Sequence, residues 1–132
     1  MSKDKPDSSL AENQRVSLAQ ALSRLSESPG QRFTTVFEHG SLAAEIFAPR
    51  GVDTQQPHTR DEIYIVIEGS GEFLNADVRH KIEPGDFLFV PAGVAHRFEN
   101  FTDDLLLWVI FYGPEGGELG TTRPQRATEE SV

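Results

Sequence analysis

Short apolar runs separated by turn residues dominate this 132-residue chain after Gly30. The runs are rich in valine, isoleucine, phenylalanine and tyrosine, which favour β-strands. They cover residues 33–38, 42–48, 62–68, 86–90 and 105–112. Glycine, proline, asparagine or aspartate stands between successive runs, as in Pro91-Ala92-Gly93. Turn signals at such regular intervals predict an all-β sandwich or barrel.

One segment before these runs has helical periodicity instead. Its apolar residues follow the spacing i, i+3, i+4 and i+7, which places them on one helix face; they are Leu18, Ala21, Leu22 and Leu25. Ser17 is suited to cap the helix, and Gln20 three residues later completes a capping box. The tripeptide at residues 28–30, Ser-Pro-Gly, ends it. The sequence therefore predicts a short helix over residues 17–26.

The length of the chain is that of a single domain, because domains usually hold about 100–150 residues. Residues 1–14 and 114–132 are polar and lack apolar periodicity, so we expect them to be mobile tails. The folded domain is then expected over residues 15–113.

Composition excludes several classes of function. The chain has no cysteine, which rules out disulfides, thiolate metal ligands and cysteine nucleophiles. Its net charge of −9 disfavours binding to nucleic acid, which depends on basic side chains. No apolar run approaches the roughly 20 residues that span a bilayer, and the N-terminal residues do not resemble a signal peptide. We therefore expect a cytoplasmic protein with no nucleic-acid or membrane partner.

Two histidines stand in company that suggests metal chemistry. His58 is followed four residues later by Glu62, and Gln56 would share a strand face with His58. Imidazole, carboxylate and amide donors suit a divalent metal. Taken alone, this segment also fits a solvated polar hairpin. His96 follows a buried apolar run between two tight turns, which would point it inward.

Read together, the two segments resemble the cupin superfamily. The first matches the pattern His, three residues, Glu, six residues, Gly at His58, Glu62 and Gly69. The second matches Gly, five residues, Pro-x-Gly, two residues, His, three residues, Asn; its residues are Gly85, Pro91, Gly93, His96 and Asn100. The resemblance implies a double-stranded β-helix, or jelly-roll barrel, with one divalent metal held by His58, Glu62 and His96.

One position departs from the family pattern. Cupins usually carry a histidine two residues before the one matched by His58, and here that residue is Gln56. The spacing from Gly51 to Gln56 is also one residue shorter than usual. The set Gln-x-His, Glu, His resembles the zinc site of phosphomannose isomerases in ligand types. We therefore expect Gln56 to be a fourth metal ligand; the alternatives are that it hydrogen-bonds a ligand water or points away from the site. Zinc, manganese, iron and nickel all remain open.

Strand alternation predicts what lines the barrel. An inward His96 sends Phe98 inward, and Glu62 takes Tyr64 with it. Both faces of the last strand are apolar, so two sets of residues could point inward. One set is Leu106, Trp108 and Ile110, and the other is Leu107, Val109 and Phe111. We expect Tyr64, Phe98 and Trp108 to line a pocket for a small molecule. Strands that are apolar on both faces also predict a second sheet or a partner chain, and small cupins commonly form homodimers.

The resemblance leaves the activity open between two classes. The first is a metal-dependent enzyme of the dioxygenase, isomerase or lyase type, acting on a small oxygenated molecule in the barrel. The second is a non-catalytic cupin that binds or senses such a molecule. Because one fold hosts many activities, the resemblance by itself assigns no catalytic residue.

Overall fold

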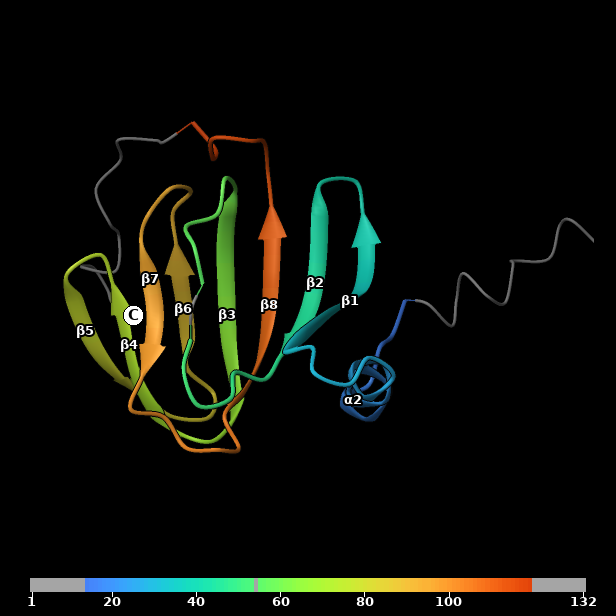
Figure 1. The fold of residues 1–132 in the computed structure, drawn as a ribbon. Coiled ribbons are helices and arrows are strands. Elements are labelled where there is room, and N and C mark those ends of the chain that lie inside the picture. The colour runs from blue at the N-terminus through green and yellow to red at the C-terminus, as the bar shows by residue number, and fades with distance from the viewer. Residues whose placement is uncertain (1–13, 54, 120–132) are drawn as a thin grey trace, which may run out of the picture.

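The structure is a computed structural model and describes residues 14–53 and 55–119. Within these ranges it contains one helix and eight strands (Figure 1). In chain order they are α2 (Leu18–Ser26), β1 (Phe33–His39), β2 (Leu42–Phe47), β3 (Asp61–Glu68), β4 (Gly71–Asn75), β5 (Val78–Ile82), β6 (Phe87–Val90), β7 (His96–Glu99) and β8 (Leu106–Tyr112). These elements confirm the predicted all-β fold with a short N-terminal helix.

The strands form two antiparallel sheets. The larger sheet has the order β1-β2-β8-β3-β6, and the smaller has the order β5-β4-β7. Residues from both sheets build the main apolar core; it comprises Phe47, Tyr64, Val66, Phe73, Ile82, Val90, Phe98, Leu105, Leu107 and Val109. The two sheets therefore enclose one interior.

Helix α2 begins and ends as predicted. Ser17 accepts a hydrogen bond from the Gln20 backbone, and the Gln20 side chain accepts one from the Ser17 backbone, which is the expected capping box. The helix buries Ala21 and Leu25 against the outer side of β1 and β2, where Figure 1 shows it. Leu22, at the edge of the same stripe, remains 38% exposed. No helix in the described part of the chain is long and apolar enough to cross a membrane.

Strand β8 shows which of its two apolar faces looks inward. Leu107 and Val109 belong to the main core, and Phe111 packs against it. Leu106 and Trp108 point the other way and pack in the second apolar cluster, beneath α2. The expectation that Trp108 lines the ligand pocket is therefore wrong, because α2 covers the outer face of the sheet and gives this indole an apolar contact there.

Two residues of the sequence motifs, Gly69 and Asn100, adopt backbone conformations that most other residues tolerate poorly. Gly69 lies at φ +86°, and a Cβ at this position would come within 2.6 Å of the Leu105 backbone. Asn100 adopts φ +50°, in the left-handed region that asparagine tolerates better than most residues. These positions let the loops after β3 and β7 cross at close range.

Most of the two predicted tails, residues 1–13 and 120–132, lies outside the described residues. Residues 114–119 are described, and they fold back onto the barrel. The Glu118 backbone donates to Asp61 Oδ2 at 2.9 Å, and the Gly116 backbone donates to the Thr59 carbonyl at 2.6 Å. Residues 114–119 are thus joined to the barrel by hydrogen bonds, and Gly116 and Gly117 adopt left-handed conformations in this segment.

Candidate metal centre

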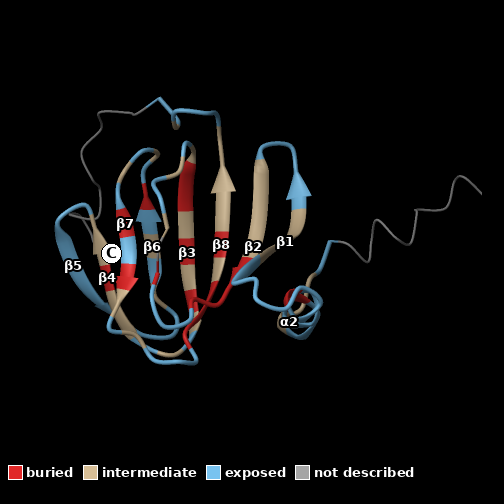
Figure 2. Ribbon diagram, in the orientation of Figure 1, coloured by how far each residue is buried: buried red, intermediate tan, exposed pale blue. Residues whose placement is uncertain are grey.

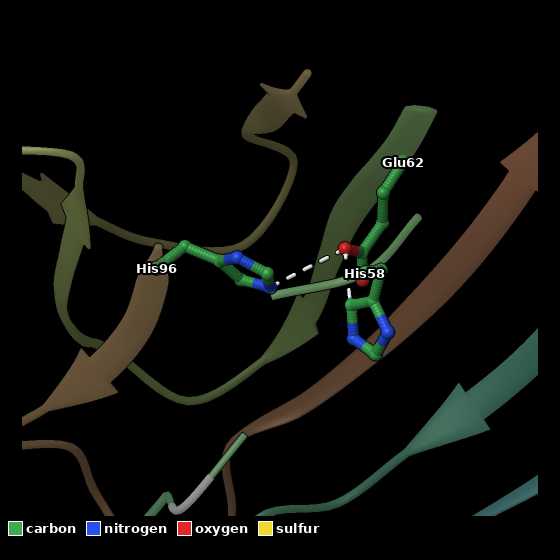
Figure 3. Close-up of side chains that lie close together, drawn as sticks. All are labelled: His58, Glu62 and His96. Atoms are coloured by element: carbon green, nitrogen blue, oxygen red, sulfur yellow. Dashed lines mark ion pairs between the residues drawn. The ribbon is translucent and has the colours of Figure 1, made fainter. Parts of the chain in front are cut away.

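Three side chains from separate elements converge inside the barrel: His58, Glu62 and His96, hereafter the triad. His58 lies in the loop before β3, Glu62 is the second residue of β3, and His96 opens β7. One donor atom from each lies within 4.8 Å of the other two. Figure 3 shows the Glu62 carboxylate between the two imidazole rings. The structure therefore brings together three of the four residues that the sequence proposes as metal ligands.

The Glu62 carboxylate is buried without hydrogen bonds. Its residue is 1% exposed, and neither oxygen accepts a hydrogen bond from any described residue. Oε1 lies 3.3 Å from His96 Nε2 and 3.9 Å from His58 Nε2. Buried carboxylates are normally paired, hydrogen-bonded or bound to a metal, because an isolated buried charge is costly. The two orphaned oxygens therefore fit a bound cation.

The ring of His96 is held in an orientation that suits metal binding. Its Nδ1 lies 2.9 Å from the Val94 carbonyl and donates to it, which leaves Nε2 facing Glu62. A ligating histidine usually donates its other ring N–H to a carbonyl in this way. Burial lowers the pKa of His96, but the Glu62 carboxylate, the Val94 carbonyl and Asp53 together outweigh burial and raise it.

A cavity of about 420 Å³ opens beside the triad and includes two of its residues. Its lining is Arg32, Phe33, Glu45, Phe47, Pro49, Asp53, Gln55, Gln56, His58, Glu62, Val109 and Phe111. Glu45, on β2, is half-buried and accepts a hydrogen bond from Thr35 at 3.5 Å. Burial, followed by the charge of Glu62, raises the pKa of Glu45. The cavity thus combines an apolar wall with a carboxyl group that holds its proton more tightly than usual.

The other predicted pocket residues lie deeper than expected. Tyr64 is fully buried, and its hydroxyl is 3.1 Å from His96 Nε2. Burial, followed by the charge of Glu62, raises the pKa of Tyr64 well above its ordinary value. Phe98 is 1% exposed and packs edge-on against the Tyr64 ring at 5.0 Å. Both project inward as alternation predicts, but they support the triad from behind instead of lining the cavity.

The two adjacent glutamines are placed differently. Gln56 lines the cavity but is exposed. Gln55 is partly buried, and its amide oxygen lies 3.0 Å from the Tyr64 hydroxyl and 3.4 Å from His58 Nε2. Sequence reasoning missed Gln55 because it assumed a strand through residues 56–58, whereas β3 begins only at Asp61. In a loop the period-two rule does not apply, so no simple pattern identifies the inward residue.

Comparison with known proteins agrees with this fold. The family described as "Cupin domain" matches residues 44–112, more than half of the chain. The protein named "Uncharacterized protein SCO3923", from Streptomyces coelicolor, is 38% identical over 63 residues, covering 48% of this chain and 60% of that protein. Acireductone dioxygenase from Drosophila melanogaster is 38% identical over 58 residues, covering 40% of this chain and 31% of the enzyme.

A solved structure supports the same fold. KdgF from Halomonas sp. superimposes with a TM-score of 0.56 at 26% sequence identity, covering 64% of this chain and 82% of that chain. The two curated relatives above are longer than the region they share with this chain, which spans about a third to three fifths of their length.

Proposed function

The chain belongs to the cupin domain family, and from this premise we propose that it is a divalent-metal-dependent enzyme acting on a small oxygenated organic molecule. The observation that carries the proposal is the buried Glu62 carboxylate, which lies between two histidines and has no hydrogen-bond partner among the described residues. A barrel interior built only for stability has no need of a carboxylate there, since an apolar side chain of similar size avoids its desolvation.

The types of donor atom limit which divalent metals the triad can bind. Two imidazole nitrogens and one carboxylate suit zinc, manganese, iron or nickel. When bound, such an ion acts as a Lewis acid that polarises an oxygen atom of the substrate. The protein contributes the fixed orientation of His96, which the Val94 carbonyl holds, and a site that is closed from behind by Tyr64 and Phe98.

The cavity suggests the kind of substrate and a proton carrier. Its volume of about 420 Å³ and its apolar wall suit a small organic molecule. Glu45 shares this cavity with the triad, and its raised pKa favours the protonated form that a general acid needs. Arg32 stands at the same cavity and supplies a positive charge for an acidic group of the substrate. The likeness to a relative named acireductone dioxygenase favours a dioxygenase within the predicted classes.

A turnover assay tests this function. The apoprotein is loaded separately with Zn²⁺, Mn²⁺, Fe²⁺ and Ni²⁺ and incubated in air with a panel of small hydroxyketones, hydroxy acids and sugar phosphates. Consumption of each compound is followed by NMR. We expect turnover of at least one compound by one loaded form, and its loss in His96→Ala. Binding of panel compounds without any turnover would favour the sensing or storage role instead, and failure of every ion to bind would contradict both.

We also propose that the protein is a homodimer through the outer face of its larger sheet. On β6, Phe87 is 63% exposed and Phe89 is 42% exposed. Register places Phe87 beside Ile65 and Phe89 beside Ile63, so these residues form one apolar stripe, hereafter the outer stripe. Contiguous apolar surface of this kind is typical of protein–protein contacts.

A further inference from the structure

We propose that the side-chain amide oxygen of Gln55 is a fourth protein donor of the metal centre. The inference rests on the proposed function, because it requires that the triad binds an ion. It differs from the expectation based on the sequence, which assigned this role to the neighbouring Gln56. Three features of the structure support it: the orientation of the Gln55 amide, the position of its oxygen, and the different surroundings of Gln56.

Asp53 fixes which end of the Gln55 amide faces the triad. The Gln55 Nε2 donates to Asp53 Oδ2 at 2.9 Å, and the Gln55 backbone donates to Asp53 Oδ1 at 3.1 Å. Asp53 is itself 7% exposed and also accepts from the Phe98 backbone at 2.9 Å. A flipped amide would place its oxygen against the carboxylate, where it finds only acceptors. The oxygen is therefore the end that points toward the triad.

The position of this oxygen suits a shared ligand sphere. It lies 3.4 Å from His58 Nε2, and Glu62 Oε1 lies 3.3 Å from His96 Nε2. Donors that share one ion at about 2.1 Å are separated by roughly 3.0–3.4 Å in octahedral or tetrahedral arrangements. The 3.4 Å between Gln55 Oε1 and His58 Nε2 is compatible with this range.

Tyr64 completes the support of Gln55 without blocking it. The Tyr64 hydroxyl donates to Gln55 Oε1 at 3.0 Å. An amide oxygen has two acceptor lone pairs, so the second is free for an ion when His58 Nε2, 3.4 Å away, carries no proton. Metal ligands are themselves commonly held by such outer hydrogen bonds. Because the tyrosine proton is used by Gln55, the lone pair of His96 Nε2 also stays available.

Gln56 lacks these features. Its side chain is exposed, and within residues 14–53 and 55–119 it makes no hydrogen bond to the triad. Since a ligand placed by its surroundings loses less entropy on binding than a free surface side chain, Gln55 is the better-prepared donor.

Titration with Ni²⁺ tests the inference in the full-length protein. Apo forms of the wild type, Gln55→Leu and Gln55→Asn are compared by calorimetry with Gln56→Leu as the matched control. Gln55→Leu removes the amide at similar volume, and Gln55→Asn withdraws the oxygen by one methylene group. We expect both Gln55 variants to raise the Kd by at least about tenfold, with Gln56→Leu equal to the wild type. Thermal unfolding of each apo form checks that the variant is folded. If Gln55→Leu does not fold, the result for Gln55→Asn is used to test the inference.

The absorption spectrum of the Co²⁺ form distinguishes a donor from a supporting residue. Replacing a protein oxygen by water alters the Co²⁺ ligand field, so the spectrum should change in the Gln55 variants and not in Gln56→Leu. Unchanged affinity in both Gln55 variants, or weaker affinity with an unchanged spectrum, would overturn the inference. A wild type that binds neither ion would instead defeat the proposed function, and the inference with it.

Discussion

The two faces of strand β3 each carry residues that are unusual for their surroundings. Toward the interior, the strand presents Glu62 among buried apolar neighbours, and both carboxylate oxygens lack hydrogen bonds within the described chain. Toward the outside, it presents Ile63 and Ile65, beside the exposed rings of Phe87 and Phe89. Figure 2 shows this alternation of buried and half-buried residues along β3. The proposed ion would compensate the buried carboxylate on the inner face, and the proposed second chain would cover the apolar stripe on the outer face.

Substitutions in the outer stripe are expected to have the largest effect, a change of the oligomeric state. Replacing Phe87 and Phe89 together by glutamate places two charges in the proposed interface, where desolvation and repulsion oppose association. We expect the wild type to have the mass of a dimer by light scattering at micromolar concentration, and the double variant to have that of a monomer. Val52→Glu, which alters a 61% exposed residue away from the sheets, should leave the dimer intact. A monomeric wild type would contradict the proposed dimer through the outer stripe.

The inner face is tested by the coupling of metal to stability. A ligand present at about 100 times its Kd stabilises a protein by about 2.7 kcal/mol. With Ni²⁺ at that excess, we expect the wild type to gain this free energy of unfolding and Glu62→Gln to gain almost none. Chemical denaturation with and without the ion measures both values. Glu68→Gln, which neutralises an exposed carboxylate on the same strand, should behave as the wild type; an equal gain in all three proteins would mean that the ion binds elsewhere.

Helix α2 packs on the outer face of β1 and β2, a part of the larger sheet that the proposed dimer interface does not include. Its capping box joins Ser17 and Gln20 through two hydrogen bonds of 3.1 and 2.8 Å. Ser17→Ala should lower the free energy of unfolding by about 1 kcal/mol, while metal affinity stays unchanged because the helix lies outside the barrel. Ser23→Ala, in the exposed helix interior, is the control and should not destabilise. A destabilisation by Ser23→Ala of the same size would show that the cap has no special role.

Replacing Glu45 gives the smallest predicted effect, a change in how stability depends on pH. The direction of this change follows from the raised pKa of Glu45. Burial and the charge of Glu62 raise the pKa of Glu45 in the folded protein, so the folded state binds this proton more tightly than the unfolded state. Its contribution to stability is therefore full at low pH and is lost as the pH rises from the ordinary glutamate value of 4.5 through the raised pKa. Glu45→Gln should flatten this decline and make the apoprotein more stable at neutral pH, whereas Glu38→Gln, at an exposed residue of β1, should not. Steeper decline in Glu45→Gln would contradict the assignment.

The sequence predicted those parts of the molecule whose local pattern has one physical solution. Alternation along β3 and β7 placed Glu62, Tyr64 and Phe98 inward, and the serine cap located the start of α2. The face of β8 was not predictable, because both faces are apolar and only the packing of α2 assigns Trp108 to the outside. Gln55 was missed for a related reason. In the loop before β3, the direction of a side chain is set by distant partners such as Asp53 and Tyr64.

Native mass spectrometry of the wild type and His96→Ala tests the central claim most directly. Both proteins are purified without chelator or immobilised-metal resin, and the mass of each chain is compared with the mass after acid denaturation. The account predicts one divalent ion per wild-type chain and none in His96→Ala, with both proteins folded. The same metal content in the two proteins, or no ion in the wild type even after incubation with Zn²⁺, Mn²⁺, Fe²⁺ or Ni²⁺, would contradict it.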